Sequence, residues 1–223
     1  MKHLQLFENF KDIDAICKKY GITNYTINKD GTVDVDDLVD LFSRGLTKLP
    51  LKFGRVTGNF NCNHNQLTTL EGCPKEVGDS FYCNDNLLTT LEGSPKKVGE
   101  HFICNKNKLT TLKGCTEEVG GGFSCLLNEL ISLEGGPKKV GSFFDCSSNK
   151  LTSLEGYPKE LDGYFECWRN PIENIYNLFG SLKEFQDSMD YGYLRGTDII
   201  KLRFKEALEE IGVKLPKEIK GYN

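Results

Sequence analysis

The chain has 223 residues, of which 38% are hydrophobic and 27% charged, and its formal net charge is -4. These values are typical of one compact domain or one capped repeat array, and the dispersed charges lack the basic stripe that a nucleic-acid backbone requires. Charged residues interrupt the first 14 positions where a secretion signal needs an apolar core, and no segment has the length of a membrane span, so we expect a cytoplasmic protein that binds neither nucleic acid nor membrane.

Residues 1–34 are expected to form an N-terminal cap made of a helix and a hairpin. The spacing of apolar residues predicts a helix around residues 10–20. In the stretch YTINKDGTVDV, the pair Asp30-Gly31 lies between alternating apolar residues, which is typical of a hairpin turn. The cap therefore precedes the first strand of the main domain.

The same stretch has a partial likeness to a calcium-binding loop. With glycine at the sixth place, Asn28, Asp30 and Asp34 occupy ligand places, but the first place is Thr26 and the last is Asp37 instead of glutamate. The hairpin is the better interpretation, and we expect no bound metal.

A period of 21 residues governs the segment 35–175. Phenylalanine, cysteine and asparagine each recur at this interval: Phe60, Phe81, Phe102, Phe123, Phe144, Phe165; Cys62, Cys83, Cys104, Cys125, Cys146, Cys167; Asn65, Asn86, Asn107, Asn128, Asn149, Asn170. The alternation in F-x-C points Phe and Cys inward from a short strand, and Gly and Pro in EGCPKE break any helix on the return path. The pattern predicts a solenoid with a parallel sheet on its concave side and an extended or irregular convex side.

The repeat resembles the leucine-rich-repeat pattern L-x-L-x-x-N-x-L, with Phe and Cys in the first two leucine places. The wording NQLTTLEGCPKEVG is similar to that of short leucine-rich-repeat proteins predicted in tailed bacteriophages and some bacteria, and the likeness covers roughly residues 30–175. This resemblance implies a curved leucine-rich-repeat solenoid, mainly β and α+β overall. It implies no assigned activity.

Residues 176–223 are expected to close the other end of the solenoid. The stretches SLKEFQDSMDY and TDIIKLRFKEALEEIG have helical spacing, with Thr197 or Asp198 as candidate N-caps and Gly212 as a stop. The sequence therefore predicts a helical C-terminal cap.

Six of the nine cysteines take the inward place of the strand, where a free thiol acts as a small hydrophobe. Cys73 and Cys115 fall in return loops two repeats apart, and no Cys-x-x-Cys or Cys/His set is present. We expect free thiols in a reducing compartment and no cofactor.

The outward strand positions carry no demand from the fold, so they are the candidate binding positions. Apolar and aromatic residues gather toward the middle and C-terminal half of this face, and we hypothesise that the partner-binding residues are Tyr82, Ile103, Leu126, Leu127, Phe143, Tyr164, Trp168 and Arg169. Two structural interpretations compete: stacking of aromatic neighbours such as Phe143 and Tyr164, or cover by the C-terminal helices.

The residues favour a non-catalytic protein-protein interaction module. By resemblance to the phage-encoded repeats, the partner is expected to be a host bacterial protein, such as a component of antiphage defence, that the chain inhibits or redirects. One alternative is a structural or assembly protein of a virion. A third is a hydrolase that uses Asp145 and Glu166, which occupy the same outward column on adjacent strands. The oligomeric state is left open.

Overall fold

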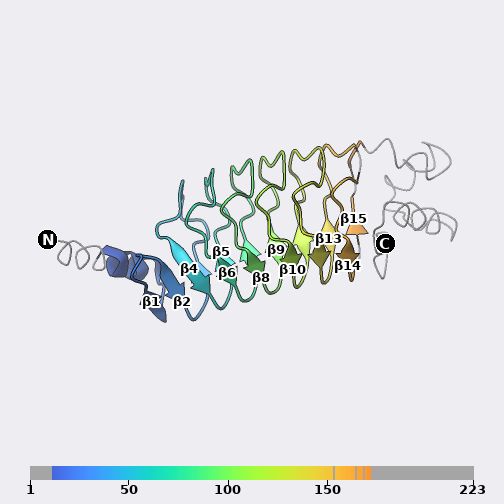
Figure 1. Cartoon of the computed structure of the whole chain (residues 1–223). Helices are drawn as coiled ribbons and strands as arrows, with labels where there is room; N and C mark the ends of the chain where they lie inside the picture. Colours follow the sequence, from blue (N-terminus) through green and yellow to red (C-terminus); the bar gives the residue numbers. More distant parts are fainter. Residues whose placement is uncertain (1–11, 153, 164, 168, 172–223) are drawn as a thin grey trace, which may run out of the picture.

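The backbone winds into a solenoid of stacked coils that runs from the N-terminal side to the C-terminal side in Figure 1. The computed structural model describes residues 12–152, 154–163, 165–167 and 169–171. Each complete coil of 21 residues contributes one short strand to each of two sheets, here named sheet A and sheet B. Within each sheet, the strands of successive coils are parallel. The predicted solenoid is therefore confirmed.

Sheet B contains the F-x-C motif, and its seven strands pair in register in the order β15-β13-β11-β9-β7-β5-β3. The strands are β3 (Val39–Asp40), β5 (Phe60–Asn61), β7 (Phe81–Tyr82), β9 (Phe102–Ile103), β11 (Phe123–Ser124), β13 (Phe144–Asp145) and β15 (Phe165–Glu166). Residues at equivalent places in successive coils form columns. We number coils 1 to 6 by the phenylalanine of each sheet B strand: Phe60, Phe81, Phe102, Phe123, Phe144 and Phe165.

Sheet A lies on the return path, where the sequence analysis expects an extended or irregular backbone. It has eight strands: β1 (Tyr25–Ile27), β2 (Val33–Val35), β4 (Phe53–Val56), β6 (Glu76–Val77), β8 (Lys97–Val98), β10 (Glu118–Val119), β12 (Lys139–Val140) and β14 (Glu160–Leu161). In each two-residue strand the charged residue is exposed and the apolar residue is buried. This alternation has the strand period of two, but it is too short to recognise in one repeat.

The described part of the N-terminal region contains helical residues 12–20, followed by an antiparallel hairpin of β1 and β2. In the hairpin turn, the Asn28 amide donates to the Thr32 carbonyl over 2.8 Å. Gly31 lies in this turn with a φ of 80°, which glycine adopts readily. Cys17 and Ile22 are buried against the first coil. These elements extend the core beyond coil 1, and β2 pairs with β4 in parallel.

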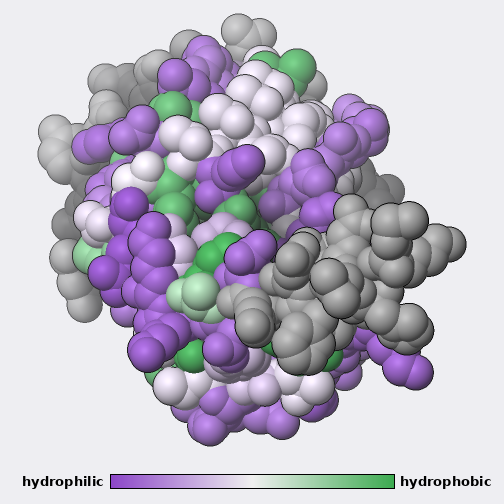
Figure 2. All heavy atoms as spheres, turned by 90° about the vertical axis from the view of Figure 1, so that its left-hand side faces the viewer, coloured by the Kyte–Doolittle hydropathy of each residue, from purple (hydrophilic) through white to green (hydrophobic). Residues whose placement is uncertain are grey.

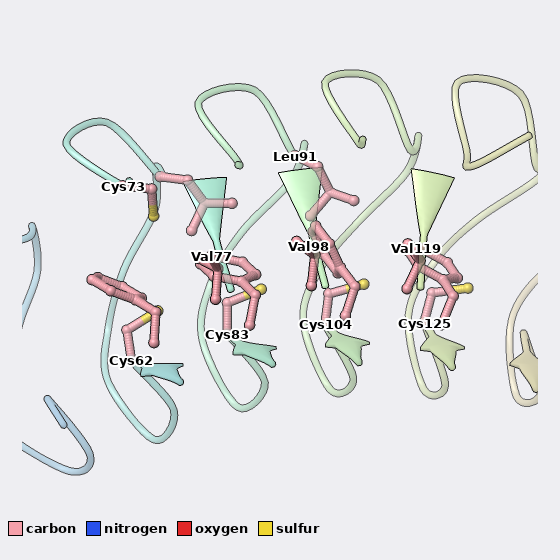
Figure 3. Close-up of a cluster of buried hydrophobic side chains, with 14 of the residues drawn as sticks. Cys62, Cys73, Val77, Cys83, Leu91, Val98, Cys104, Val119 and Cys125 are labelled. Atoms are coloured by element: carbon pink, nitrogen blue, oxygen red, sulfur yellow. The ribbon is translucent and has the colours of Figure 1, made fainter. Parts of the chain in front are cut away.

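The core consists of columns of identical side chains stacked along the solenoid axis. The phenylalanine rings of neighbouring coils have centroids 5.0 to 6.0 Å apart. Figure 3 shows Cys83 and Cys104 beside Val77 and Val98 inside the coils. No single coil encloses these side chains, so burial depends on the neighbours.

A tight corner joins sheet A to sheet B, and glycine occupies it in coils 2 to 5. A Cβ atom on Gly99 would lie 1.8 Å from the carbonyl oxygen of Gly78 in the preceding coil. Gly120 makes the same approach to Gly99 at 1.9 Å. Because no side chain fits between these backbones, the V-G pair of the repeat fixes where the chain turns between the sheets.

On the opposite side of the coil, the asparagine column ties each turn to its neighbours. The Asn107 amide nitrogen donates to the Cys83 carbonyl of the preceding coil over 3.0 Å and to the Cys104 carbonyl over 3.1 Å. Its oxygen accepts from the Leu88 amide at 3.0 Å. The buried asparagine column therefore has a structural role in joining adjacent coils.

The cysteines are free thiols, as the sequence predicts. The thiols of the F-x-C cysteines are buried, and the Cys62 and Cys104 sulfurs donate to carbonyl oxygens of the next coil at 3.3 Å. Burial raises the pKa of Cys62 to about 12, which keeps the thiol protonated and unreactive.

Some predictions concern residues outside the described part of the chain. The predicted C-terminal helical cap, 176–223, falls entirely there, as do the candidate binding residues Tyr164 and Trp168. Within the described residues, no helix is both long enough and apolar enough to cross a lipid bilayer.

Candidate functional site: the outer face of sheet B

The outer face of sheet B is built from four columns. The pre-strand column contains Leu38, Asn59, Ser80, His101, Gly122 and Phe143. The strand column contains Asp40, Asn61, Tyr82, Ile103, Ser124, Asp145 and Glu166. The post-strand column contains Phe42, Asn63, Asn84, Asn105, Leu126 and Ser147. The turn column, which follows it, contains His64, Asp85, Lys106, Leu127, Ser148 and Arg169. Leu38 and Phe42, on either side of β3, are exposed.

In the pre-strand column, polar side chains hydrogen-bond to the backbone of the next coil. The Ser80 amide donates to the Asn59 side chain at 3.0 Å, and the His101 amide donates to the Ser80 hydroxyl at 3.2 Å. The Gly122 amide continues the series by donating to His101 Nδ1 at 2.8 Å. These polar residues stabilise the stack of coils, so their presence on the face does not indicate a binding site.

The post-strand column uses the same device between coils 1 and 2 and between coils 3 and 4. The Asn84 amide donates to Asn63 Oδ1 at 2.8 Å, and the Leu126 amide donates to Asn105 Oδ1 at 3.0 Å. The Leu126 side chain cannot accept a hydrogen bond from the Ser147 amide of coil 5. That amide instead donates to Asp145 Oδ1 of its own coil at 2.9 Å. The apolar residue at position 126 is therefore accompanied by a carboxylate that takes over the missing acceptor role.

Phe143 packs against its neighbours along sheet B, as expected if its role is to stabilise the sheet and not to bind a partner. A Cβ atom on Gly122 would lie only 2.1 Å from the Phe143 ring, so the ring occupies the space over that glycine. The Phe143 ring also lies 5.6 Å from the ring of His101, two coils away. Covering a glycine with a neighbouring aromatic ring stabilises a sheet, so the fold itself accounts for Phe143.

Among the described candidate residues, Leu126 and Phe143 do not lie side by side on the face. The register places Leu126 beside Asn105 and Ser147, and it places Phe143 beside Gly122 at the other end of the strand. Four residues separate these two places along the strand, which is about 13 Å. Tyr82 and Ile103 do lie side by side in register and are half-buried. The sequence places Leu126, Leu127 and Phe143 in one set of candidate binding residues, whereas the register separates Phe143 from the two leucines along the strand.

Every residue of the turn column has a left-handed backbone, with φ between 51° and 57°. His64, Asp85 and Lys106 are polar there. The Asp85 carboxylate lies 3.4 Å from His64 Nε2 and forms an ion pair with Lys106 at 3.8 Å. Leu127 has a φ of 57° and is 43% exposed. A left-handed conformation costs a residue with a Cβ roughly 1–2 kcal/mol. Leu127 shares this cost with the histidine, lysine, serine and arginine of the column, and asparagine or aspartate would lower it.

Ile131 is a further apolar exception, which the sequence analysis missed. It is 63% exposed and occupies a column that is otherwise threonine: Thr47, Thr68, Thr89, Thr110 and Thr152. Comparing every column of the repeat, and not only the strand columns, would have found it. Leu126, Leu127 and Ile131 are here named the coil 4 apolar set. They lie within six consecutive residues, whereas the same columns in coils 1 to 3 and coil 5 are polar wherever the structure describes them.

Asp145 and Glu166 pair in register on β13 and β15. Burial raises the pKa of Asp145, against hydrogen bonds from Ser147 and Ser124 that lower it. Burial first, and the charge of Asp145 second, raise the pKa of Glu166 to about 7. Among the described residues, neither carboxylate takes part in an ion pair.

Other chemistry has little support on the described surface. No group of three or more His, Cys, Asp or Glu residues within that part of the chain has the geometry for a metal ion. Arg169 is exposed in the turn column, three residues after Glu166. Seen along the solenoid from its N-terminal side, the described surface is mostly hydrophilic with small hydrophobic areas (Figure 2).

The fold and the face define a β-solenoid in which a 21-residue coil is repeated. Its exposed large apolar side chains, among the described residues, are Leu127 and Ile131 in coil 4, Leu87 in coil 2, and Leu38 and Phe42 on either side of β3. The chain matches no family model, no curated protein and no solved structure.

Proposed function

We propose that this chain is a non-catalytic, protein-binding solenoid of the leucine-rich-repeat type, and that the coil 4 apolar set anchors its partner. The observation that carries the proposal is the concentration of three apolar exceptions in one coil. Leu127 and Ile131 are exposed, so the core gains little from them. Leu127 also has a left-handed backbone that disfavours leucine. Side chains that the fold does not require are candidates for a role in recognition.

The size of the face limits how a partner can bind. Seven sheet B strands at about 4.8 Å give a height of about 29 Å, and a standard interface covers about 800 Å² on each partner. The partner therefore contacts the turns beside sheet B as well as the sheet. Leu127 and Ile131, which follow the strand, lie on that side.

The biological setting rests on the resemblance of the repeat wording to phage-encoded leucine-rich repeats. On that basis the chain is a phage accessory protein in the host cytoplasm that binds and inhibits or redirects a bacterial protein, with an antiphage-defence component as one candidate. Nine free thiols suit the reducing conditions of that compartment.

A hydrolase using Asp145 and Glu166 is the weaker candidate. Asp145 Oδ1 accepts a hydrogen bond from the Ser147 amide, so this carboxylate has a structural role. A catalytic pair would also need a substrate cleft beside it. Loss of a hydrolytic activity in an Asp145→Asn variant would restore this candidate.

The test is affinity capture from bacterial lysate with the full chain as bait. The variant Leu126→Asp/Leu127→Asp is compared with wild type, and Leu87→Asp is the matched control because Leu87 is also exposed, at 39%, but lies in coil 2. We expect a protein that wild type and Leu87→Asp retain and that the double variant loses. That protein is then purified and its affinity for each variant is measured by calorimetry.

Equal retention by all three baits, with equal thermal stability, would overturn the proposal. Presence of the chain in purified phage particles, or concentration-dependent self-association that survives the double substitution, would favour the virion assembly alternative.

A further inference from the structure

Several pairs of opposite charges at equivalent places in adjacent coils form ion pairs on the surface of the solenoid: Lys113 with Glu92 at 2.8 Å, Lys138 with Glu117 at 2.9 Å, Lys150 with Glu129 at 2.9 Å and Lys139 with Glu160 at 3.4 Å. Asp145 and Glu166 instead place two acids in register on adjacent strands. Like charges directly opposite each other destabilise a sheet.

The two acids therefore leave negative charge on a half-buried part of the face. Both side chains are partly withdrawn from water. The nearest described cation in sequence, Arg169, forms no ion pair with Glu166 among the described contacts. A positive group from outside the chain would relieve the repulsion and complement the charge.

The acids lie close to the coil 4 apolar set. The register puts Leu126 opposite Ser147, two residues along the strand from Asp145 and one coil away. Two residues and one strand spacing correspond to about 8 Å. In an extended peptide, residues i and i+2 point to the same side and lie about 7 Å apart. One short segment can therefore place an apolar side chain on Leu126 and a second side chain on the acids.

We propose that the partner presents an extended segment with an apolar residue followed two positions later by lysine or arginine, the apolar residue packing on Leu126 and Leu127 and the cation lying between Asp145 and Glu166. This inference rests on the proposed protein-binding function and adds the chemistry of the partner. Charge complementarity identifies the occupant, because an acidic or neutral residue would leave the like-charge pair unrelieved.

The probe is a library of displayed random dodecapeptides, selected separately on three forms of the full chain: wild type, Asp145→Asn/Glu166→Gln and Leu126→Asp/Leu127→Asp. Asparagine keeps the oxygen that accepts the Ser147 amide, so the neutral variant retains that hydrogen bond. With wild type we expect Lys or Arg two positions after an apolar residue to be enriched about fivefold over Asp or Glu. The neutral variant should lose this preference, and the Leu126→Asp/Leu127→Asp variant should lose the apolar anchor.

A double-mutant cycle then measures the contact. The strongest wild-type peptide and its Lys→Glu counterpart are synthesised and titrated against wild type and the neutral variant. We expect the charge change to weaken binding about tenfold for wild type and less than about twofold for the neutral variant.

Other outcomes separate this inference from the proposed function. Apolar-anchored peptides with no basic preference would overturn the inference and leave protein binding by coil 4 intact. Selection of no peptide by wild type would also overturn the inference, and the lysate capture would then decide the proposed function independently. A tenfold charge effect that persists in the neutral variant would place the cation elsewhere and overturn it as well.

Discussion

The outer columns of the two sheets differ in how their side chains serve the fold. In sheet A the outward column alternates in sign from coil to coil: Arg55, Glu76, Lys97, Glu118, Lys139 and Glu160. In sheet B the equivalent column has no such order: Asn61, Tyr82, Ile103, Ser124, Asp145 and Glu166. Opposite charges across strands stabilise their pairing, so the outer face of sheet A has a structural explanation. The end of the sheet B column, with two acids in register, has none.

The same contrast exists within sheet B. Coils 1 to 3 use polar side chains to bind backbone amides of the next coil, whereas coil 4 has Gly122 and Leu126 at those places. In a repeat protein the fold imposes the same demands on every coil. A coil that departs from its neighbours in several columns is therefore where a function other than folding is expected.

The largest expected effect on stability comes from removing Asn105, a polar residue of the post-strand column. Asn105→Ala removes the acceptor of the Leu126 amide, a backbone group with little access to water. An unsatisfied amide costs about 2 kcal/mol, which we expect as a loss in the free energy of unfolding measured with denaturant. Leu126→Ala is the control and should cost less than about 1 kcal/mol. Equal losses would remove the distinction between coil 3 and coil 4.

The second prediction has the opposite sign. Leu127→Asn should raise the free energy of unfolding by about 1 kcal/mol, because asparagine tolerates the left-handed backbone better than leucine. The same substitution should weaken partner binding. Leu87→Asn, at an exposed leucine outside the positive-φ positions, should not stabilise the chain. A destabilised Leu127→Asn variant would show that this leucine serves the fold.

The third prediction concerns pH. The folded chain raises the pKa of Glu166 from 4.5 to about 7, so it binds this proton more tightly than the unfolded chain does. Stability contributed by this group is therefore lost as the pH rises from about 4.5 to 7. Glu166→Gln should flatten this part of the stability curve and be more stable than wild type at pH 8, by on the order of 1 kcal/mol after solvent screening. Parallel curves for the two proteins would show that folding does not raise the pKa of Glu166.

The smallest expected effect tests the outer column of sheet A. Glu118→Lys places a positive charge between Lys97 and Lys139, so that three lysines lie in register. We expect the free energy of unfolding to fall by only about 0.5 kcal/mol, because the side chains are exposed. The loss, measured by thermal unfolding, should shrink in high salt as the charges are screened. A loss that salt leaves unchanged would indicate packing instead of charge.

Much of the scaffold could be predicted from the sequence. The 21-residue period placed Phe102, Cys104 and Asn107 correctly in the interior, because a periodic chain can bury a column only by stacking it. The N-terminal hairpin has the turn that Asp30-Gly31 predicts. The second parallel sheet was not expected, because two-residue strands such as Glu76–Val77 are too short to give a sequence signal.

The candidate site was predicted less well. The sequence identified Leu126 and Leu127 as exceptions, but it grouped them with Phe143, which the structure places at the other end of the strand over Gly122. It also missed Ile131, whose column lies outside the strand. A repeat pattern shows which residues are unusual, whereas only the register between coils shows which of them are neighbours.

The sequence by itself determined the period, the buried columns and the identity of the exceptional coil, because each follows from residue type at a fixed interval. The tertiary structure alone decided that the turn column is left-handed and that Asp145 accepts the hydrogen bond of the Ser147 amide. It also decided that Asp145 and Glu166 lie opposite each other, without an ion pair among the described residues. These facts depend on how one coil is stacked on the next, and that contact joins residues 21 positions apart in the chain.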